Sequence, residues 1–187
     1  MKIAIALLLI CAVASACTGS TLISSERASS LVLQPGDVPP GLARFDFGPE
    51  NPQGRPFAGN REAGLRAASV ARYRQVDPSD TEGPVVVESR AEVFAGKDEA
   101  SAQLERKISA AAPRGRPVSV PKIGDQTVAR TFTQRATPVD ARFFVIVWQH
   151  VNAVGLITVQ GFDGNVQLRD AVSLALAQQR RMARASA

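Results

Sequence analysis

Two apolar segments in the last third of the chain, separated by only three residues, constrain the fold more than any other feature. Residues 142–149 (RFFVIVWQ) and 153–160 (AVGLITVQ) are rich in β-branched and aromatic residues, which favour β-strands. The intervening His150, Val151 and Asn152 are too few for a crossover connection. The two strands are therefore predicted to pair as an antiparallel hairpin.

The first strand of this hairpin is apolar on both faces. Because side chains alternate between the two faces of a strand, each face receives its own apolar set. One set is Phe144, Ile146 and Trp148, and the other is Phe143, Val145 and Val147. Such a strand belongs in the centre of a sheet, and we expect helices or loops to cover both of its sides.

Other segments show the periodicity of strands and helices. We predict strands at residues 65–75, 85–95 and 127–133, and helices at residues 97–112 and 166–183. For residues 65–75 the alanine content leaves a helix as the alternative. Within the last helix one face is apolar and the opposite face carries Arg169, Arg180 and Arg184. That arginine face is predicted to be solvated.

The order of these elements predicts the fold class. Strands come first, then a helix, then antiparallel strands and a final helix, which is typical of an α+β fold. We expect an antiparallel sheet with helices packed on its faces, an α/β/α-type sandwich, in a single domain at residues 31–187. Residues 48–62 are rich in Pro and Gly and are expected to form a surface loop.

The start of the chain has the pattern of an export signal, predicted to occupy residues 1–16. Lys2 supplies a positive charge, and residues 3–13 form an uncharged, apolar run. This run is shorter than the roughly 20 residues of a membrane-spanning helix but matches the core of a signal peptide. Residues 17–30, rich in Ser and other small residues, are predicted to be a flexible tether.

The segment before Cys17 resembles the lipobox of bacterial lipoproteins, in which an apolar stretch and small residues precede a cysteine. The resemblance implies that the Cys17 sulfur receives a diacylglyceryl group, that cleavage follows Ala16, and that the new amine is acylated, for example by palmitate. Such acyl chains, at about 0.8 kcal/mol per buried methylene, anchor a protein firmly. We therefore expect a protein of the cell envelope, held on the outer face of a bacterial membrane.

One position departs from the lipobox pattern. The third residue before the cysteine is usually Leu and is Ala14 here. Ala14, Ser15 and Ala16 also satisfy the A-x-A rule of ordinary signal peptidase, so plain secretion is the alternative. We favour lipidation, because secretion would leave Cys17 as an unpaired terminal thiol.

Cysteine and charge content limit the other possibilities. Cys11 and Cys17 are the only cysteines, so the predicted mature chain has no intramolecular disulfide and depends on its core. The formal net charge is +5, and removal of Lys2 leaves 21 basic and 17 acidic residues, or +4. The cations are scattered, which argues against nucleic-acid binding. The expected partners are the membrane, through the lipid, and an envelope protein or small ligand.

Several short motifs of the mature chain point to a known family. They are Asp-Val-Pro-Pro-Gly-Leu at residues 37–42, Val-Phe-Ala at 93–95, Ile-Gly-Asp at 123–125, and the late hairpin. In these the chain is similar to the family with a PsbP/Mog1-like α/β/α sandwich, which includes extracellular sensor domains of some bacterial kinases. The resemblance implies a fold and a binding or accessory role, and no functional residue carries over.

Residues with catalytic or metal-binding chemistry are sparse. His150 is the only histidine, and its place at a hairpin tip predicts an exposed turn residue rather than a member of a Ser-His-Asp triad. A zinc site would need more His or Cys ligands than the chain offers. The spacing of Asp77, Asp80 and Glu82 does not match an EF-hand, so we expect a solvated turn there.

Two further features are interpreted as structural. The segment Asp163-Gly164-Asn165 is predicted to be a turn and a helix cap. The aromatic residues Tyr73, Phe143, Phe144 and Trp148 are interpreted as core, with the lining of an apolar pocket as the alternative.

We therefore expect a lipid-anchored envelope protein with a non-catalytic binding or accessory domain. Its only predicted modified residue is Cys17, and no pattern indicates a catalytic residue, a cofactor or a metal. One alternative is an envelope hydrolase that uses carboxylates in residues 35–64. Another is a carrier of an apolar ligand, which would contain an apolar cavity.

Overall fold

The predicted hairpin lies inside a seven-stranded antiparallel sheet. The structure is a computed structural model, and it describes residues 21–50, 64–77, 79, 81–111 and 115–187. Strands β6 (Ala141–His150) and β7 (Ala153–Phe162) form the hairpin, with Phe144 opposite Val159. The order of strands in the sheet is β1-β2-β3-β7-β6-β5-β4.

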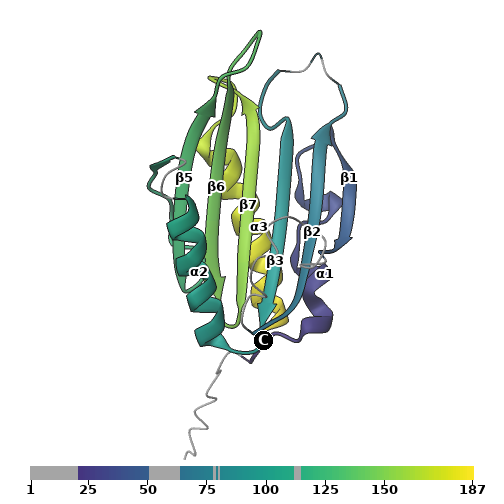
Figure 1. Cartoon of the computed structure of the whole chain (residues 1–187). Helices are drawn as coiled ribbons and strands as arrows, with labels where there is room; N and C mark the ends of the chain where they lie inside the picture. Colours follow the sequence, from purple (N-terminus) through teal and green to yellow (C-terminus); the bar gives the residue numbers. More distant parts are fainter. Residues whose placement is uncertain (1–20, 51–63, 78, 80, 112–114) are drawn as a thin grey trace, which may run out of the picture.

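The remaining strands extend the sheet on both sides of the hairpin (Figure 1). On one side are β3 (Val86–Phe94), β2 (Leu65–Gln75) and the edge strand β1 (Leu42–Pro49). On the other are β5 (Gln126–Gln134) and the short β4 (Arg116–Pro117). The predicted strands at residues 65–75, 85–95 and 127–133 thus correspond to β2, β3 and β5.

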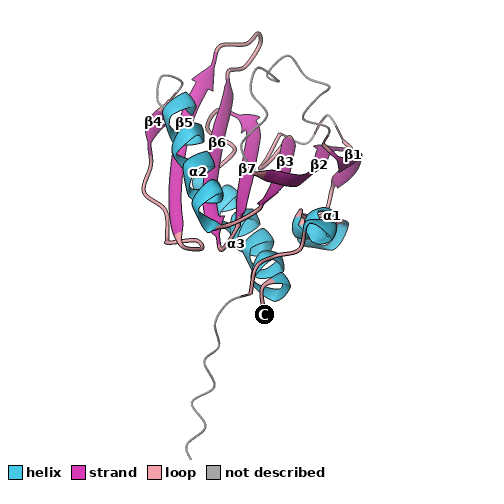
Figure 2. Ribbon diagram, turned by 60° about the horizontal axis from the view of Figure 1, so that its bottom comes forward, coloured by secondary structure: helices cyan, strands magenta, loops and turns pink. Residues whose placement is uncertain are grey.

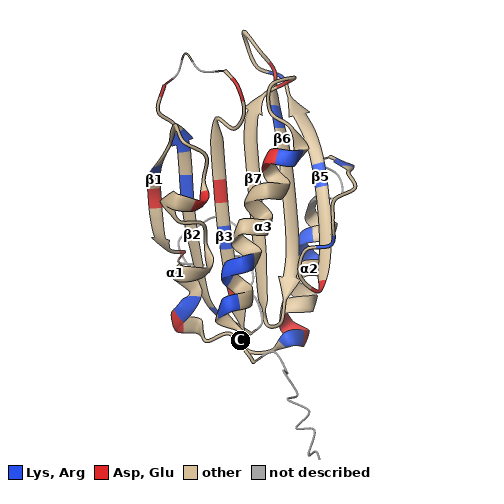
Figure 3. Ribbon diagram, turned by 180° about the vertical axis from the view of Figure 1, so that it is seen from behind, with Lys and Arg blue, Asp and Glu red and all other residues tan. Residues whose placement is uncertain are grey.

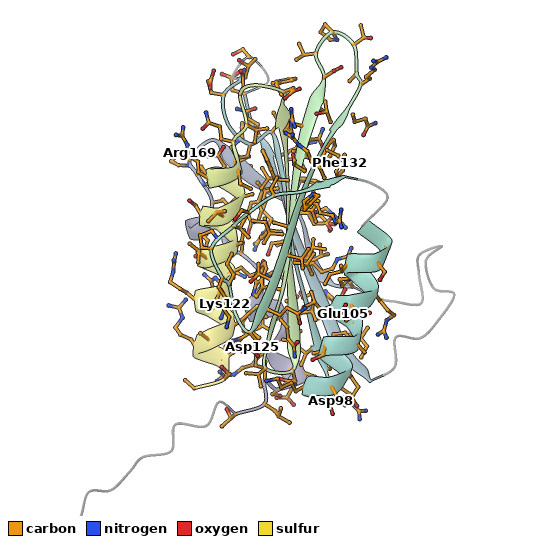
Figure 4. The ribbon with its side chains drawn as sticks, turned by 90° about the vertical axis from the view of Figure 1, so that its left-hand side faces the viewer. Asp98, Glu105, Lys122, Asp125, Phe132 and Arg169 are labelled. Carbon is orange, nitrogen blue, oxygen red and sulfur yellow. The ribbon has the colours of Figure 1, made fainter. Side chains whose placement is uncertain are left out.

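Helices cover both faces of the sheet, as the doubly apolar β6 predicted. Helix α3 (Leu168–Ala185) and the single turn α1 (Ala28–Leu31) lie on one side, called the back face, and α2 (Lys97–Ala111) lies on the other, called the front face (Figures 2 and 4). The short 3-10 helices η1 (Ser25–Arg27) and η2 (Pro35–Asp37) flank α1. The predicted α+β fold, in a single domain with helices on both faces, is confirmed.

The back face carries the main hydrophobic core. Trp148, Tyr73 and Ile157 are completely buried there beneath α1 and α3. A buried polar network fixes α3 on this face: the Ser89 hydroxyl donates to Gln178 Oε1 at 2.8 Å, and Gln178 Nε2 donates to the Arg90 carbonyl at 2.8 Å. Because each buried polar group has a partner, the network holds the helix in place without a large desolvation cost.

The front face has a smaller core under α2. Its buried members are Phe94, Ala100, Leu104, Val147 and Val154. Helix α2 contacts β6, β7 and β3. It therefore covers one end of the central strands, and no other helix of the described residues lies over the front face (Figure 1).

The predicted tether at residues 17–30 needs correction for its described part. Residues 21–30 do not form a flexible linker, because they include η1 and most of α1. Ile23 is 2% exposed, and its N–H donates to Asn152 Oδ1 at 2.8 Å. Burial of Ile23 and Ala28 against the sheet supplies the free energy that orders this segment.

Strand β1 and the cap of α3 also differ from the sequence-based expectations. Residues 42–49 were not predicted as a strand. They form the edge strand β1, whose side chains are mostly exposed and whose polar–apolar alternation is limited to residues 44–47 before Gly48 and Pro49. The cap of α3 is Gln167, whose N–H donates to the carboxylate of Asp170. Asp163 instead forms an ion pair with Arg142, with Nη2 of Arg142 2.7 Å from Oδ1 of Asp163. Most of the loop expected at residues 48–62 lies outside the described residues.

A candidate binding surface on the front of the sheet

The front face changes character along the length of its strands. In the second half of β6, where α2 covers the sheet, residues on both sides of the strand are buried. In the first half, back-face residues such as Phe144 are buried while front-face residues such as Phe143 and Val145 are only half-buried. We call this region, which no described helix covers, the open half of the front face.

Strand register determines which side chains share the open half. Residues directly opposite one another in antiparallel strands point to the same side of the sheet. One row crosses six strands in this way and consists of Asp46, Arg72, Glu88, Thr158, Val145 and Arg130. The next row away from α2 contains Arg74, Val86, Gln160, Phe143 and Phe132. The open half therefore carries most of its charges over β1–β3 and, apart from Arg130 on β5, is apolar over β5–β6.

The charged side of the open half is a ladder of ion pairs. Arg72 bridges neighbouring strands by binding Asp46 on β1 and Glu88 on β3, the latter at 2.6 Å from Nε to Oε2. Burial acts to lower the pKa of Arg72, but the hydrogen bonds and charges of Glu88 and Asp46 outweigh it and hold the pKa above its ordinary value. This guanidinium is therefore a permanent positive charge on the surface.

Arg90 continues the ladder along β3. Its Nη2 lies 2.9 Å from Glu50 and 3.5 Å from Glu88, and its Nη1 lies 3.9 Å from Glu92. The Nε of Arg90 is buried and has no hydrogen-bond acceptor within the described residues. Glu88 is thus shared by two arginines, and its carboxylate is held in a fixed position at the edge of the charged side.

Glu92 joins this ladder to α2. It is only 4% exposed and accepts from Lys107 Nζ at 2.8 Å and from Gln103 Nε2 at 3.2 Å, both on α2. A buried carboxylate is tolerated only when it is paired and hydrogen-bonded. These contacts fix where α2 sits on the sheet and hence where the open half begins.

The apolar side of the open half is built around two aromatic rings. Phe132 of β5 and Phe143 of β6 stack with their ring centroids 4.7 Å apart and their planes 6° from parallel. Figure 4 shows Phe132 on the same side of the sheet as α2, beyond the end of that helix. Both rings are half-buried, so part of their apolar surface remains in contact with solvent.

His150 does not lie in the open half, and its predicted exposure is wrong. It points to the back face and is half-buried, with Nε2 2.8 Å from Ser186 Oγ and Nδ1 3.2 Å from Gln179 Nε2. Burial lowers its pKa below the ordinary value, although the negative charge of Asp125 acts in the opposite direction. The C-terminal end of α3 covers the hairpin tip, and the sequence pattern of the hairpin did not reveal this contact.

The hydrogen bonds around His150 fix its tautomer. The indole N–H of Trp148 can only donate, so the atom of Gln179 that lies 2.8 Å from it must be the acceptor Oε1. The amide Nε2 of Gln179 is then free to donate to Nδ1 of His150. Nε2 of His150 then carries the proton and donates to Ser186, whose hydroxyl donates to the Ala183 carbonyl at 3.1 Å. This arrangement is the reverse of a Ser-His pair in which the imidazole accepts the serine proton.

The described acidic residues of the segment suggested for a hydrolase site each form an ion pair with an arginine. In the described part of residues 35–64, Asp37 binds Arg181 Nε at 2.5 Å, Asp46 binds Arg72, and Glu50 binds Arg90. Glu62 lies outside the described residues. Paired carboxylates of this kind stabilise the fold, whereas a glycosidase-type site requires two carboxyl groups that face a shared substrate.

The remaining predicted residues occupy structural positions. Tyr73, Phe144 and Trp148 belong to the back-face core, and only Phe143 reaches the open half. Asp77 accepts from the N–H and hydroxyl of Ser79 within a turn, and these bonds lower its pKa. No cluster of metal-ligating side chains is found among the described residues. Asp80 and Cys17 lie outside them.

Sequence reasoning missed the residues of the charged ladder, although β3 contained a signal for them. Its charged residues Glu88, Arg90 and Glu92 recur at every second position, which places them on one face of a strand. The partners Arg72 and Asp46 could not be identified, because their pairing depends on the register between β1, β2 and β3.

Comparison with known proteins identifies a similar fold. No family model and no curated protein matches the sequence. The extracellular domain of PknH from Mycobacterium tuberculosis has a similar structure, with a TM-score of 0.65 over 89% of this chain and 99% of that domain, at 14% sequence identity. Among the described residues, no helix combines the length and apolarity needed to cross a bilayer. This chain therefore shares its fold with an extracellular domain of a mycobacterial protein.

Proposed function

We propose that this chain is an exported, lipid-anchored protein of the cell envelope, and that its domain binds a ligand or partner on the open half of the front face without catalysing a reaction. The observation that carries the proposal is the contrast between the two faces. The back face is filled by α1 and α3, whereas the open half presents the half-buried Phe132–Phe143 stack beside an ordered ladder of charges. The shared fold with an extracellular domain supports an exported role.

The open half is suited to an amphipathic ligand. A flat apolar group gains by covering the exposed parts of Phe132 and Phe143. Thr158 and Gln160, which lie between the rings and the ladder, supply hydrogen-bonding groups. The fixed carboxylate of Glu88 and the guanidinium of Arg90 then select the charge pattern of the ligand. This open surface supports binding of a partner or small ligand better than it supports an apolar carrier, which would enclose its ligand in a cavity.

Site-specific photocrosslinking in intact cells tests the binding surface. A photoreactive phenylalanine analogue is placed at Phe132, and a matched control is placed at Thr133, which is exposed and points to the opposite face of the same strand. We expect a discrete adduct, detected by mass spectrometry, at position 132 and none at position 133. Equal adducts at both positions, or none at either, would contradict the proposal.

The lipid anchor has its own test. The intact mass of protein extracted from membranes should exceed that of residues 17–187 by the mass of a diacylglyceryl group and the amine-linked acyl chain. Cys17→Ser should abolish this mass increase and release the protein from the membrane fraction. An unmodified mass for the original chain would show plain secretion instead.

A further inference from the structure

A cluster of arginines lies at the end of the molecule where the described chain begins and ends. A shallow cavity of about 180 Å³ is lined by Arg27, Ser30, Arg181, Arg184 and Ala185. The cavity lies between the η1–α1 segment and the C-terminal turns of α3, and Arg27 Nη1 donates to the Ala185 carbonyl at 3.5 Å. Next to it, Thr21 N donates to the Ser186 carbonyl at 2.9 Å. The polar lining of this cavity therefore comes from two segments far apart in the sequence.

The charge of this corner is predominantly positive. Arg180 is exposed on the preceding turn of α3, and together with Arg27 and Arg184 it makes no ion pair with any described residue. Arg181 is the exception, because its Nε binds Asp37. Figure 3 shows the basic residues gathered on the C-terminal turns of α3 and beside α1. We call Arg27, Arg180 and Arg184 the arginine end.

The arginine end lies close to the proposed lipid. Four residue steps separate Cys17 from Thr21, and at most about 3.6 Å per step limits the separation to roughly 14 Å. The headgroup region on each side of a bilayer is roughly 5–7 Å thick. Leu22, the next residue after Thr21, is 59% exposed. An acylated Cys17 would thus keep the exposed arginines and the exposed leucine within reach of the phospholipid headgroups.

We propose that the arginine end is a docking surface for anionic phospholipid headgroups, with the guanidinium groups binding lipid phosphate and Leu22 entering the interface. Guanidinium groups bind phosphate through paired, charge-assisted hydrogen bonds. Docking would fix the orientation of the domain relative to the membrane. Phe132 and the C-terminal end of α3 lie at opposite ends of the molecule (Figure 4), so the open half of the front face would point away from the membrane. This inference rests on the proposed anchor at Cys17.

Vesicle binding by the unlipidated chain tests the surface independently of the anchor. Residues 17–187 carrying Cys17→Ser are sedimented with vesicles of equimolar phosphatidylcholine and phosphatidylglycerol, or of phosphatidylcholine alone. We expect binding to the anionic vesicles only, with a reduction of about fivefold in the partition coefficient for each of Arg180→Gln and Arg184→Gln. Raising the salt concentration to about 1 M should abolish binding, because it shortens the screening length to about 3 Å.

Arg169→Gln is the matched control. Arg169 is an exposed arginine of the same helix but lies at its opposite end (Figure 4), so this variant should bind like the original chain. Equal binding to both vesicle types, or an equal loss in the control, would overturn the docking surface. Saturable binding of inorganic phosphate without preference for anionic vesicles would overturn lipid as its occupant.

The two proposals fail in different ways. If the mass of membrane-extracted protein shows no acyl groups while the arginine variants still lose vesicle binding, the anchor fails and the docking surface stands. If the acyl groups are present but the unlipidated chain ignores anionic vesicles, the anchor stands and the docking surface fails.

Discussion

A single buried asparagine joins three segments of the chain. Asn152 is 2% exposed and lies in the turn between β6 and β7. Its Oδ1 accepts from Ile23 N at 2.8 Å, and its Nδ2 donates to the carbonyls of Ile23 at 3.1 Å and Phe94 at 2.8 Å. The residue therefore fixes the N-terminal segment and the end of β3 to the hairpin turn.

We predict that Asn152→Ala lowers the free energy of unfolding by about 3 kcal/mol, because it removes three buried hydrogen bonds. Chemical denaturation measures this change. Asn165→Ala is the control, since Asn165 makes one exposed side-chain hydrogen bond, to the Thr81 carbonyl, and should cost less than about 1 kcal/mol. Similar losses in the two variants would show that Asn152 does not have this role.

The environment of His150 makes stability depend on pH. Its pKa in the folded protein is lowered, chiefly by burial, so the unfolded chain binds a proton more readily. The stability linked to His150 is therefore present above its unfolded pKa of about 6.5 and is lost as the pH falls toward the folded pKa. Because His150 is the only histidine, denaturation curves between about pH 7.5 and 5.5 report on this residue. We expect stability to fall over that interval, and His150→Gln to flatten the dependence; an unchanged slope in the variant would refute the prediction.

Among the secondary-structure elements, the fit of β6 to β7 depends on a residue without a side chain. Gly155 lies directly opposite Trp148 in the hairpin, and a Cβ at this position would be 2.4 Å from Cζ2 of the indole. Trp148 is fully buried and holds Gln179 of α3 through its indole N–H. The glycine thus makes room for the ring that joins the hairpin to α3.

We predict that Gly155→Ala destabilises the protein by about 1–3 kcal/mol, because the indole must move within a filled core. Thermal or chemical denaturation measures the loss, and Trp148 fluorescence should report the altered packing. Gly36→Ala is the matched control, since a Cβ there meets no atom within 4 Å. An equal effect in the two variants would contradict the steric argument.

At the scale of the whole molecule, the two faces of the sheet are stabilised unequally. The buried residues of α2 are Ala100, Gln103 and Leu104, whereas α3 buries Ala171, Leu174, Ala175, Ala177, Gln178 and Met182. The front-face core is correspondingly smaller than the back-face core. Because local opening requires less free energy where fewer apolar contacts are lost, α2 should be the more dynamic helix.

Native-state hydrogen exchange tests this difference. We predict that amides in the middle of α2 exchange through a smaller opening free energy than those in the middle of α3. Glu92→Gln should lower the protection of α2 selectively, because it weakens the bonds to Lys107 and Gln103. Equal protection of the two helices would show that the domain opens only as a whole.

The element pattern was largely accessible from the sequence because it is local. Alternation and β-branched content located β2, β3, β5, β6 and β7, and the doubly apolar β6 indicated coverage on both faces. Strand β1 was missed because its alternation is short and its side chains are mostly exposed at the edge of the sheet. The start of the domain was placed too late because Ile23 is buried through contacts with residues far along the chain, in the back-face core and at Asn152.

The sequence by itself therefore determined the class of fold and the central hairpin, since both are encoded in consecutive residues. The export signal with Cys17 stays a prediction of the same local kind. The tertiary structure alone decided which side chains meet. Strand register brought Arg72 between Asp46 and Glu88. The packing of α3 half-buried His150 and placed Arg184 beside Arg27. These contacts join residues far apart in the chain, and no local periodicity specifies such pairings.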